Sequence, residues 1–220
     1  MPEFINGLQN LHIAALLAAH AFVAGSATLV SAGDRPGDPF GNHTIELTKE
    51  APLFSIWEFL KDQVVLDKKE FHACLAQSNS SCPEVATLMK IVDGARQNQG
   101  KALLGHLNRS INLMIKAVPG EWSGPLDVLK MRNGDCKSYS IAKYAAARVA
   151  GFTPDQVRAV IVHSQRRHED HMVTTVYLDG KWLILDNLTL LLLQDSEQED
   201  YVPLAVLDYK GARSYPSAFN

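Results

Sequence analysis

The sequence predicts an α+β fold in which helices come first and an antiparallel sheet follows. Between residues 54 and 151 the apolar residues recur with the 3.6-residue period of helices. From residue 157 onward the period changes to two, which is typical of strands. The dipeptide Asp179-Gly180 then predicts a tight hairpin. Helices followed by strands, rather than alternating with them, favour separate layers.

Each element follows from its own pattern and end signals. Helices are expected at 55–65, 84–97, 101–116, 125–130 and 136–150. Ser55 and Ser123 are expected to cap the first and fourth helices, and a continuation of the first to Cys74 is left open. Gly151 is expected to end the fifth, because glycine readily adopts the left-handed conformation. Strands are expected at 157–163, 171–178, 181–186 and 201–207.

Composition and charge narrow the class of protein. The 220 residues are 46% hydrophobic and 20% charged, which indicates one globular domain. The net charge is −3, from 21 basic and 24 acidic residues, and no cluster of Lys and Arg is longer than two. Nucleic-acid binders usually show a basic surplus, so no nucleic-acid partner is expected.

The N-terminal region differs from the rest of the chain. No charged residue occurs from Leu11 to Ala32, and Val30-Ser31-Ala32 offers small residues before a cleavage point. This pattern predicts a signal peptide over 1–32 and an exported protein. An uncleaved membrane anchor and a buried helix are the alternatives. The Pro- and Gly-rich stretch 33–53 is expected to be a linker, followed by the main domain over 54–220.

Two of the three cysteines suit an oxidising compartment. Cys74 and Cys82 flank a turn-like segment, so a local disulfide between them is expected. Two buried free thiols are the alternative. Cys136 is the third cysteine, outside this expected pair, and its sequence surroundings differ from those of Cys74 and Cys82.

The predicted hairpin brings a histidine and an acid together. With Asp179-Gly180 as the loop, Val173 lies opposite Asp186, and His171 lies two residues further along on the same face. His171 and Asp186 are therefore diagonal neighbours across the hairpin, close enough for an imidazole to meet a carboxylate.

Cys136 supplies the third element of a catalytic hypothesis. It follows Gly134-Asp135 at the expected start of a helix, where unpaired N–H groups and the helix dipole stabilise a thiolate. Beside His171 it would be a nucleophile, with Asp186 holding the imidazole tautomer. The expected reaction is attack on an amide carbonyl followed by hydrolysis of a thioester. A packed cysteine and a structural histidine are the alternative interpretation.

Several segments together resemble a known family. Asn133 to Tyr144, Asp170-His171-Met172-Val173 and Leu185-Asp186-Asn187 resemble the bacterial transglutaminase-like cysteine proteases. The resemblance extends upstream to the pair of Cys74 and Cys82-Pro83, to Leu107 to Asn112, and to Trp122 with Pro125. The resemblance implies a papain/transglutaminase-like core, with Cys136 as nucleophile, His171 as general base and acid, and Asp186 as the orienting acid. Within this family, the sequence is similar to the periplasmic LapG-type proteases. Those proteases clip surface adhesins under the control of an inner-membrane receptor for cyclic-di-GMP. A periplasmic location is therefore expected, with a membrane-anchored form as the alternative.

The sequence departs from that family at one point. LapG-type members carry acids after the nucleophile that help to hold a calcium ion, whereas this chain has Lys137 and Ser138. An ammonium opposes calcium binding, so a calcium requirement is doubtful and Asp135 is only a weak ligand candidate. Asn112 and Trp122 are weaker candidates for the substrate cleft, Asn112 as an oxyanion donor, and packing roles are favoured for both.

Three functions fit these residues. The preferred one is an exported cysteine endopeptidase that processes a cell-surface protein. The second is acyl transfer to an amine, as in transglutaminases, and the third is a catalytically silent binding module of the same fold. No organic cofactor is expected with any of them.

Overall fold

The computed structural model describes residues 36–41, 43–64 and 82–216. The predicted signal peptide over 1–32 and the continuation of the first helix to Cys74 lie outside the described residues. The Cys74–Cys82 disulfide also stays a prediction, because Cys74 lies outside them. Within the described ranges, no helix is long and apolar enough to cross a membrane.

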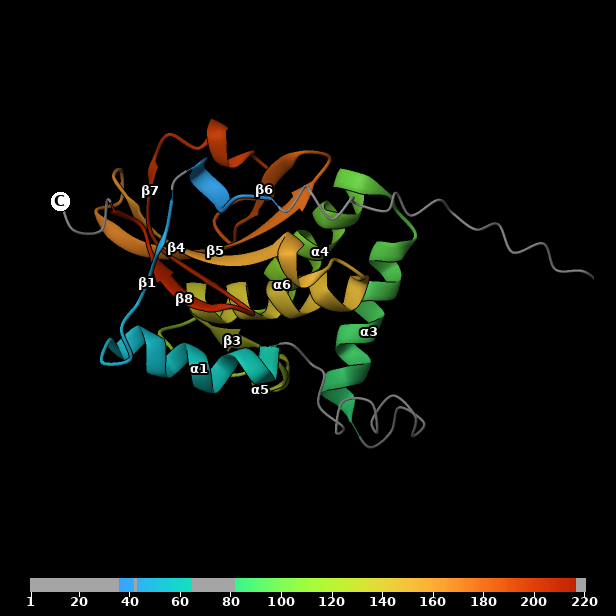
Figure 1. The fold of residues 1–220 in the computed structure, drawn as a ribbon. Coiled ribbons are helices and arrows are strands. Elements are labelled where there is room, and N and C mark those ends of the chain that lie inside the picture. Colours follow the sequence, from blue (N-terminus) through green and yellow to red (C-terminus); the bar gives the residue numbers. More distant parts are fainter. Residues whose placement is uncertain (1–35, 42, 65–81, 217–220) are drawn as a thin grey trace, which may run out of the picture. The chain divides into compact units, whose positions relative to one another are not determined.

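A six-stranded sheet forms one layer of the domain (Figure 1). Its order is β1-β8-β7-β4-β5-β6, and all neighbouring strands are antiparallel. The strands are β1 (Ile45–Glu46), β4 (Val157–Ser164), β5 (Glu169–Leu178), β6 (Lys181–Leu185), β7 (Tyr201–Asp208) and β8 (Gly211–Ser214). A separate parallel pair joins β2 (Lys116–Ala117) to β3 (Asn133–Gly134).

The predicted hairpin and its register are confirmed. Leu178 pairs with Lys181 and Thr174 pairs with Leu185 across β5 and β6. Asp179 and Gly180 both have positive φ, at 51° and 80°, as a two-residue turn of this kind requires.

Helices form the second layer, and their bounds are close to those predicted. They are α1 (Pro52–Val64), α3 (Pro83–Arg96), α4 (Gly100–Met114), α5 (Pro125–Met131) and α6 (Cys136–Ala150). The two predicted serine caps are wrong: Ser55 lies inside α1, and Gly124 is the N-cap of α5. Proline is the first helical residue of both helices: Pro52 starts α1 three residues before Ser55, and Pro125 starts α5 one residue later than a Ser123 cap would. Gly151 ends α6 with φ 116°, as expected.

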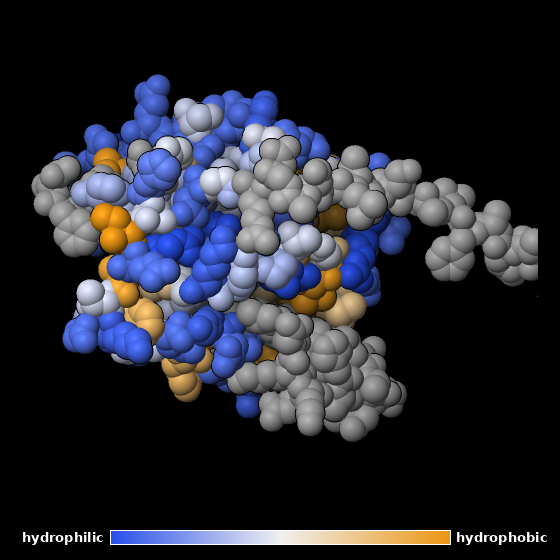
Figure 2. Space-filling model, viewed as in Figure 1, coloured by the Kyte–Doolittle hydropathy of each residue, from blue (hydrophilic) through white to orange (hydrophobic). Residues whose placement is uncertain are grey.

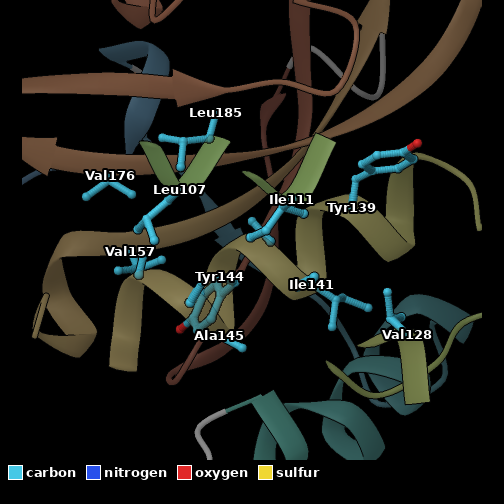
Figure 3. Packing of buried hydrophobic residues seen from close by; sticks show 14 of the residues in the cluster. Leu107, Ile111, Val128, Tyr139, Ile141, Tyr144, Ala145, Val157, Val176 and Leu185 are labelled. Carbon is cyan, nitrogen blue, oxygen red and sulfur yellow. The ribbon is translucent and has the colours of Figure 1, made fainter. Parts of the chain in front are cut away.

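The main core surrounds α6, which packs against the sheet and against the other helices. Figure 3 shows α6 contributing Tyr139, Ile141, Tyr144 and Ala145, packed against side chains of α4, α5 and the strands. Ten consecutive residues of α6, Ser138 to Ala147, are buried. The helix that starts at Cys136 is therefore fixed on nearly all sides, which makes its N-terminus a rigid position.

A smaller apolar cluster covers the other face of the sheet. It contains Val160, Val173, Ile184 and Tyr215, with Phe40 packed against it. The described residues of the predicted linker contribute here: the 3₁₀ turn η1 (Pro39–Gly41) packs on this face, and β1 pairs with β8. The surface visible in Figure 2 is mostly hydrophilic, with single apolar residues scattered over it.

Candidate active site

Cys136 is the first residue of α6. The Asp135 carboxylate caps this helix by accepting the backbone N–H of Lys137 at 3.1 Å. Gly134 has φ 151°, and a Cβ there would lie 2.1 Å from Ser138 Oγ, so glycine is required at this approach. The cysteine is thus presented half-buried at the positive end of a helix.

His171 and Asp186 are brought together by the hairpin. His171 lies near the start of β5, and Asp186 directly follows β6. The two side chains are 4% and 2% exposed, and His171 Nε2 lies 2.8 Å from Asp186 Oδ1. Since Asp186 engages Nε2, the other ring nitrogen is the one left for Cys136.

Further hydrogen bonds hold the Asp186 carboxylate. Oδ1 also accepts the backbone N–H of Leu188 at 2.9 Å, and Oδ2 accepts the Tyr201 hydroxyl at 2.6 Å. The Tyr201 ring lies 5.8 Å from the His171 ring. Both carboxylate oxygens are therefore engaged, which fixes the direction from which the acid approaches the imidazole.

The electrostatics follow from burial and these partners. Burial lowers the pKa of His171, but hydrogen bonds and charges from Asp186 and Cys136 outweigh it and raise the pKa to about 9. Burial raises the pKa of Asp186, but the hydrogen bond and charge of His171 hold it below its usual range. Burial and the Asp186 contact raise the pKa of Tyr201, so its hydroxyl stays a donor. At neutral pH the site holds an imidazolium beside a carboxylate.

The other predicted cleft residues have different surroundings. Asn112 donates its amide to the backbone oxygens of Asp186, at 2.8 Å, and of Thr189, at 3.4 Å. It therefore braces the chain just after β6 rather than facing a substrate oxygen. Trp122 is half-buried against the main core, and its ring centre lies 6.0 Å from Lys137 Nζ.

Tyr201 and Asn108 are site residues that sequence reasoning did not single out. Asn108 Nδ2 donates to Thr189 O at 3.1 Å and braces the same segment as Asn112. Tyr201 pairs with Ser164 at the start of β7, one strand away from β5. Only the strand order places Tyr201 beside Asp186, and that order is a long-range property. Asn108 had a local signal, since Asn108 and Asn112 are four residues apart on one helix face.

The surroundings of Asp135 do not fit a calcium ion. Lys137 Nζ contacts Asp135 Oδ2, so the ammonium already neutralises this carboxylate. Ser138 is 3% exposed and lies close to Gly134, and its side chain carries no negative charge to offer a cation. Among the described residues, no group of three or more His, Cys, Asp or Glu side chains is placed to hold a metal. Calcium needs six to eight oxygen ligands, which these residues do not provide.

A cysteine at the N-terminus of a buried helix, facing a sheet that presents a histidine, is the architecture of transglutaminase-like cysteine peptidases. Residues 66–203 match the model of the bacterial transglutaminase-like cysteine proteinases, more than half of the chain. The chain therefore belongs to this family, and it is a cysteine peptidase of the transglutaminase-like type. A proteinase acts on protein substrates.

Solved structures of LapG from Legionella pneumophila share the fold. The calcium-bound form is 23% identical with a TM-score of 0.56, and the match covers 68% of this chain and 87% of that one. A second LapG structure is 21% identical with a TM-score of 0.55, covering 76% and 91%. An EGTA-treated form is likewise 21% identical, with a TM-score of 0.55 and coverage of 76% and 89%. No curated protein sequence matches the chain.

The Tyr201 hydroxyl is expected to stabilise the fold through Asp186. Tyr201→Phe removes a hydrogen bond to a buried charge, so the free energy of unfolding at pH 7 should fall by about 1.5–3 kcal/mol. Urea unfolding measures this. Tyr177→Phe is the matched control, because Tyr177 is half-buried on β5 and its hydroxyl forms no hydrogen bond within the described ranges. Equal losses in the two variants would contradict the assignment.

Proposed function

We propose that the protein is an exported cysteine endopeptidase that hydrolyses a peptide bond through Cys136, His171 and Asp186. The observation that carries this proposal is the placement of His171. Its buried ring is hydrogen-bonded to Asp186 at 2.8 Å, and Cys136 raises its pKa from the other side. A histidine held between an acid and a thiol can move a proton to and from a leaving group.

Acylation follows from this arrangement. The thiolate Sγ of Cys136 attacks the carbonyl carbon of the scissile amide, and the N-terminal end of α6 favours the negative charge that develops. His171, protonated at neutral pH, gives its proton to the leaving nitrogen as the C–N bond breaks. An amine product departs, and a thioester to Cys136 remains.

Deacylation reverses the role of His171. The neutral imidazole takes a proton from a water molecule, whose oxygen attacks the thioester carbonyl. The carboxylic acid product leaves, and the imidazolium–thiolate pair is restored. Asp186 stays ionised throughout and orients the ring, while Tyr201, Asn112 and Asn108 keep Asp186 and its segment in place.

The substrate and its control are proposed from the family resemblance. A large cell-surface adhesin is the proposed substrate, and an inner-membrane receptor is the proposed regulator. The periplasm would contain both the protease and the substrate segment. The support is the likeness of the motifs around Cys136, His171 and Asp186 to those of LapG-type proteases.

We also propose that activity needs no calcium. The support is the ammonium of Lys137, which contacts the Asp135 carboxylate beside the nucleophile and is held near the Trp122 ring. The positive charge beside the Asp135 carboxylate is therefore supplied by the Lys137 side chain of the protein itself.

Hydrolysis can be separated from acyl transfer with casein and a labelled amine. Chain cleavage without amine incorporation is expected, and Cys136→Ala should abolish it. Asp186→Asn should lower the rate roughly 10²- to 10⁴-fold, because the imidazole loses its orienting acid. Asp127→Asn, at an exposed acid on α5, should leave the rate unchanged. Amine incorporation without cleavage would overturn the endopeptidase proposal.

Export is tested by the N-terminal sequence of the protein secreted to the periplasm of a bacterial host. A chain beginning at Gly33 is expected, since the small residues before it suit a signal peptidase. An exported chain that still begins with Met1 would contradict signal cleavage and favour the membrane anchor.

Calcium independence is tested by thermal unfolding and by cleavage, each with calcium or with EGTA. We expect the wild type to show the same melting temperature and rate in both. Lys137→Glu replaces the ammonium by a carboxylate, so calcium should raise the melting temperature of this variant more than that of the wild type. A wild-type activity lost in EGTA and restored by calcium would refute the proposal.

A further inference from the structure

Lys143 is a buried charged residue that the proposed reaction does not use. Its side chain is 0% exposed, and its Nζ has no hydrogen-bond partner among the described residues. Burying an amine without a partner is costly, and lysines are almost never fully buried unless paired. A lysine in this position needs an explanation other than packing.

Its place on α6 directs it toward the catalytic group. Lys143 follows Cys136 by seven residues, about two helical turns, so both lie on nearly the same face. Ser140 lies between them on this face, and its Oγ is 3.0 Å from Oγ1 of Thr174 on β5. Lysine side chains on helices point back toward the N-terminus, which brings Nζ toward the Cys136 end. Nζ lies 5.7 Å from the centre of the Tyr139 ring.

The charged group that acts on Lys143 is Asp186. Burial lowers the pKa of Lys143 to about 7, and the charge of Asp186 opposes that fall. The side chains that α4 provides near Asp186, Asn108 and Asn112, are uncharged amides. Burial raises the pKa of Tyr139 on the same helix, which therefore stays neutral. Lys143 can thus carry or lose its charge near neutral pH, with Asp186 as its counter-ion.

The charge balance of the reaction gives this ammonium a role. With a thiolate, an imidazolium and a carboxylate, the catalytic group carries one net negative charge. In the thioester intermediate the imidazole is neutral and the carboxylate remains, so the net charge is the same. One additional positive charge would therefore neutralise this group at both stages and lower the cost of burying it.

We propose that Lys143 is a positioning residue whose buried ammonium supplies the counter-charge of the Cys136–His171–Asp186 group. The proposal rests on the proposed function, because the charge count assumes the thiolate–imidazolium pair. By balancing the charge, Lys143 makes it easier for the resting site to lose the proton that creates the thiolate.

The test is the rate of Cys136 alkylation by iodoacetamide as a function of pH. In Lys143→Met the acid limb of the profile should move to higher pH by roughly half a unit to one unit, because a positive charge that favours proton loss is gone. The alkaline limb should stay in place, since Lys143 is already neutral there. A merely structural role would not move one limb alone.

Two controls keep the test decisive. Lys130→Met, at an exposed lysine of α5, should leave both limbs unchanged. Lys143→Met should stay folded at the assay temperature but melt below the wild type, because the buried negative charge loses its counter-charge. If Lys143→Met does not fold, Lys143→Gln carries the same expectation for the acid limb.

The outcomes separate this inference from the proposed function. An acid limb that is identical in the wild type and in a folded Lys143 variant would overturn the counter-charge role. A wild-type Cys136 that is alkylated no faster at pH 6 than an ordinary thiol would instead overturn the proposed thiolate–imidazolium pair itself.

Discussion

The buried hydrogen bond between His171 and Asp186 is the interaction on which the rest of the site depends. It joins the ends of two hairpin strands, so its geometry is set by the register of β5 and β6. Its cost is the burial of two ionisable groups, and the structure offsets that cost with the Tyr201 hydroxyl and the Leu188 N–H on the carboxylate. Rigid support from α4 through Asn112 then fixes the segment that follows β6.

The same interaction links stability to pH. The pKa of His171 rises from 6.5 to about 9, so its contribution to stability is fully present below pH 6.5 and is lost as pH rises through 9. The pKa of Asp186 is lowered, so its contribution is present above its ordinary value of 3.8 and is lost as pH falls through the folded value. The site is therefore held together most strongly between these limits, where the imidazolium and the carboxylate coexist.

Local patterns predicted much of this molecule, and long-range pairing accounts for the remainder. The Asp179-Gly180 turn was enough to pair His171 with Asp186, because a two-residue loop leaves a single register. Gly151 likewise marked the end of α6. The contact of Tyr201 with Asp186 depends on β7 lying beside β4, which no local signal reveals. The burial of Lys143 could not be predicted from the sequence either, because a lysine in a helix is ordinarily exposed to solvent.

The central claim is that the His171 ring is an imidazolium at neutral pH, held between Cys136 and Asp186. Nuclear magnetic resonance of ring-labelled histidine measures this directly, with His171→Gln used to assign the resonance. We expect His171 to titrate near pH 9, and its midpoint should fall in Cys136→Ala, because that variant removes one of the groups that raise the pKa. A midpoint at or below 6.5, the ordinary value for histidine, would contradict the account.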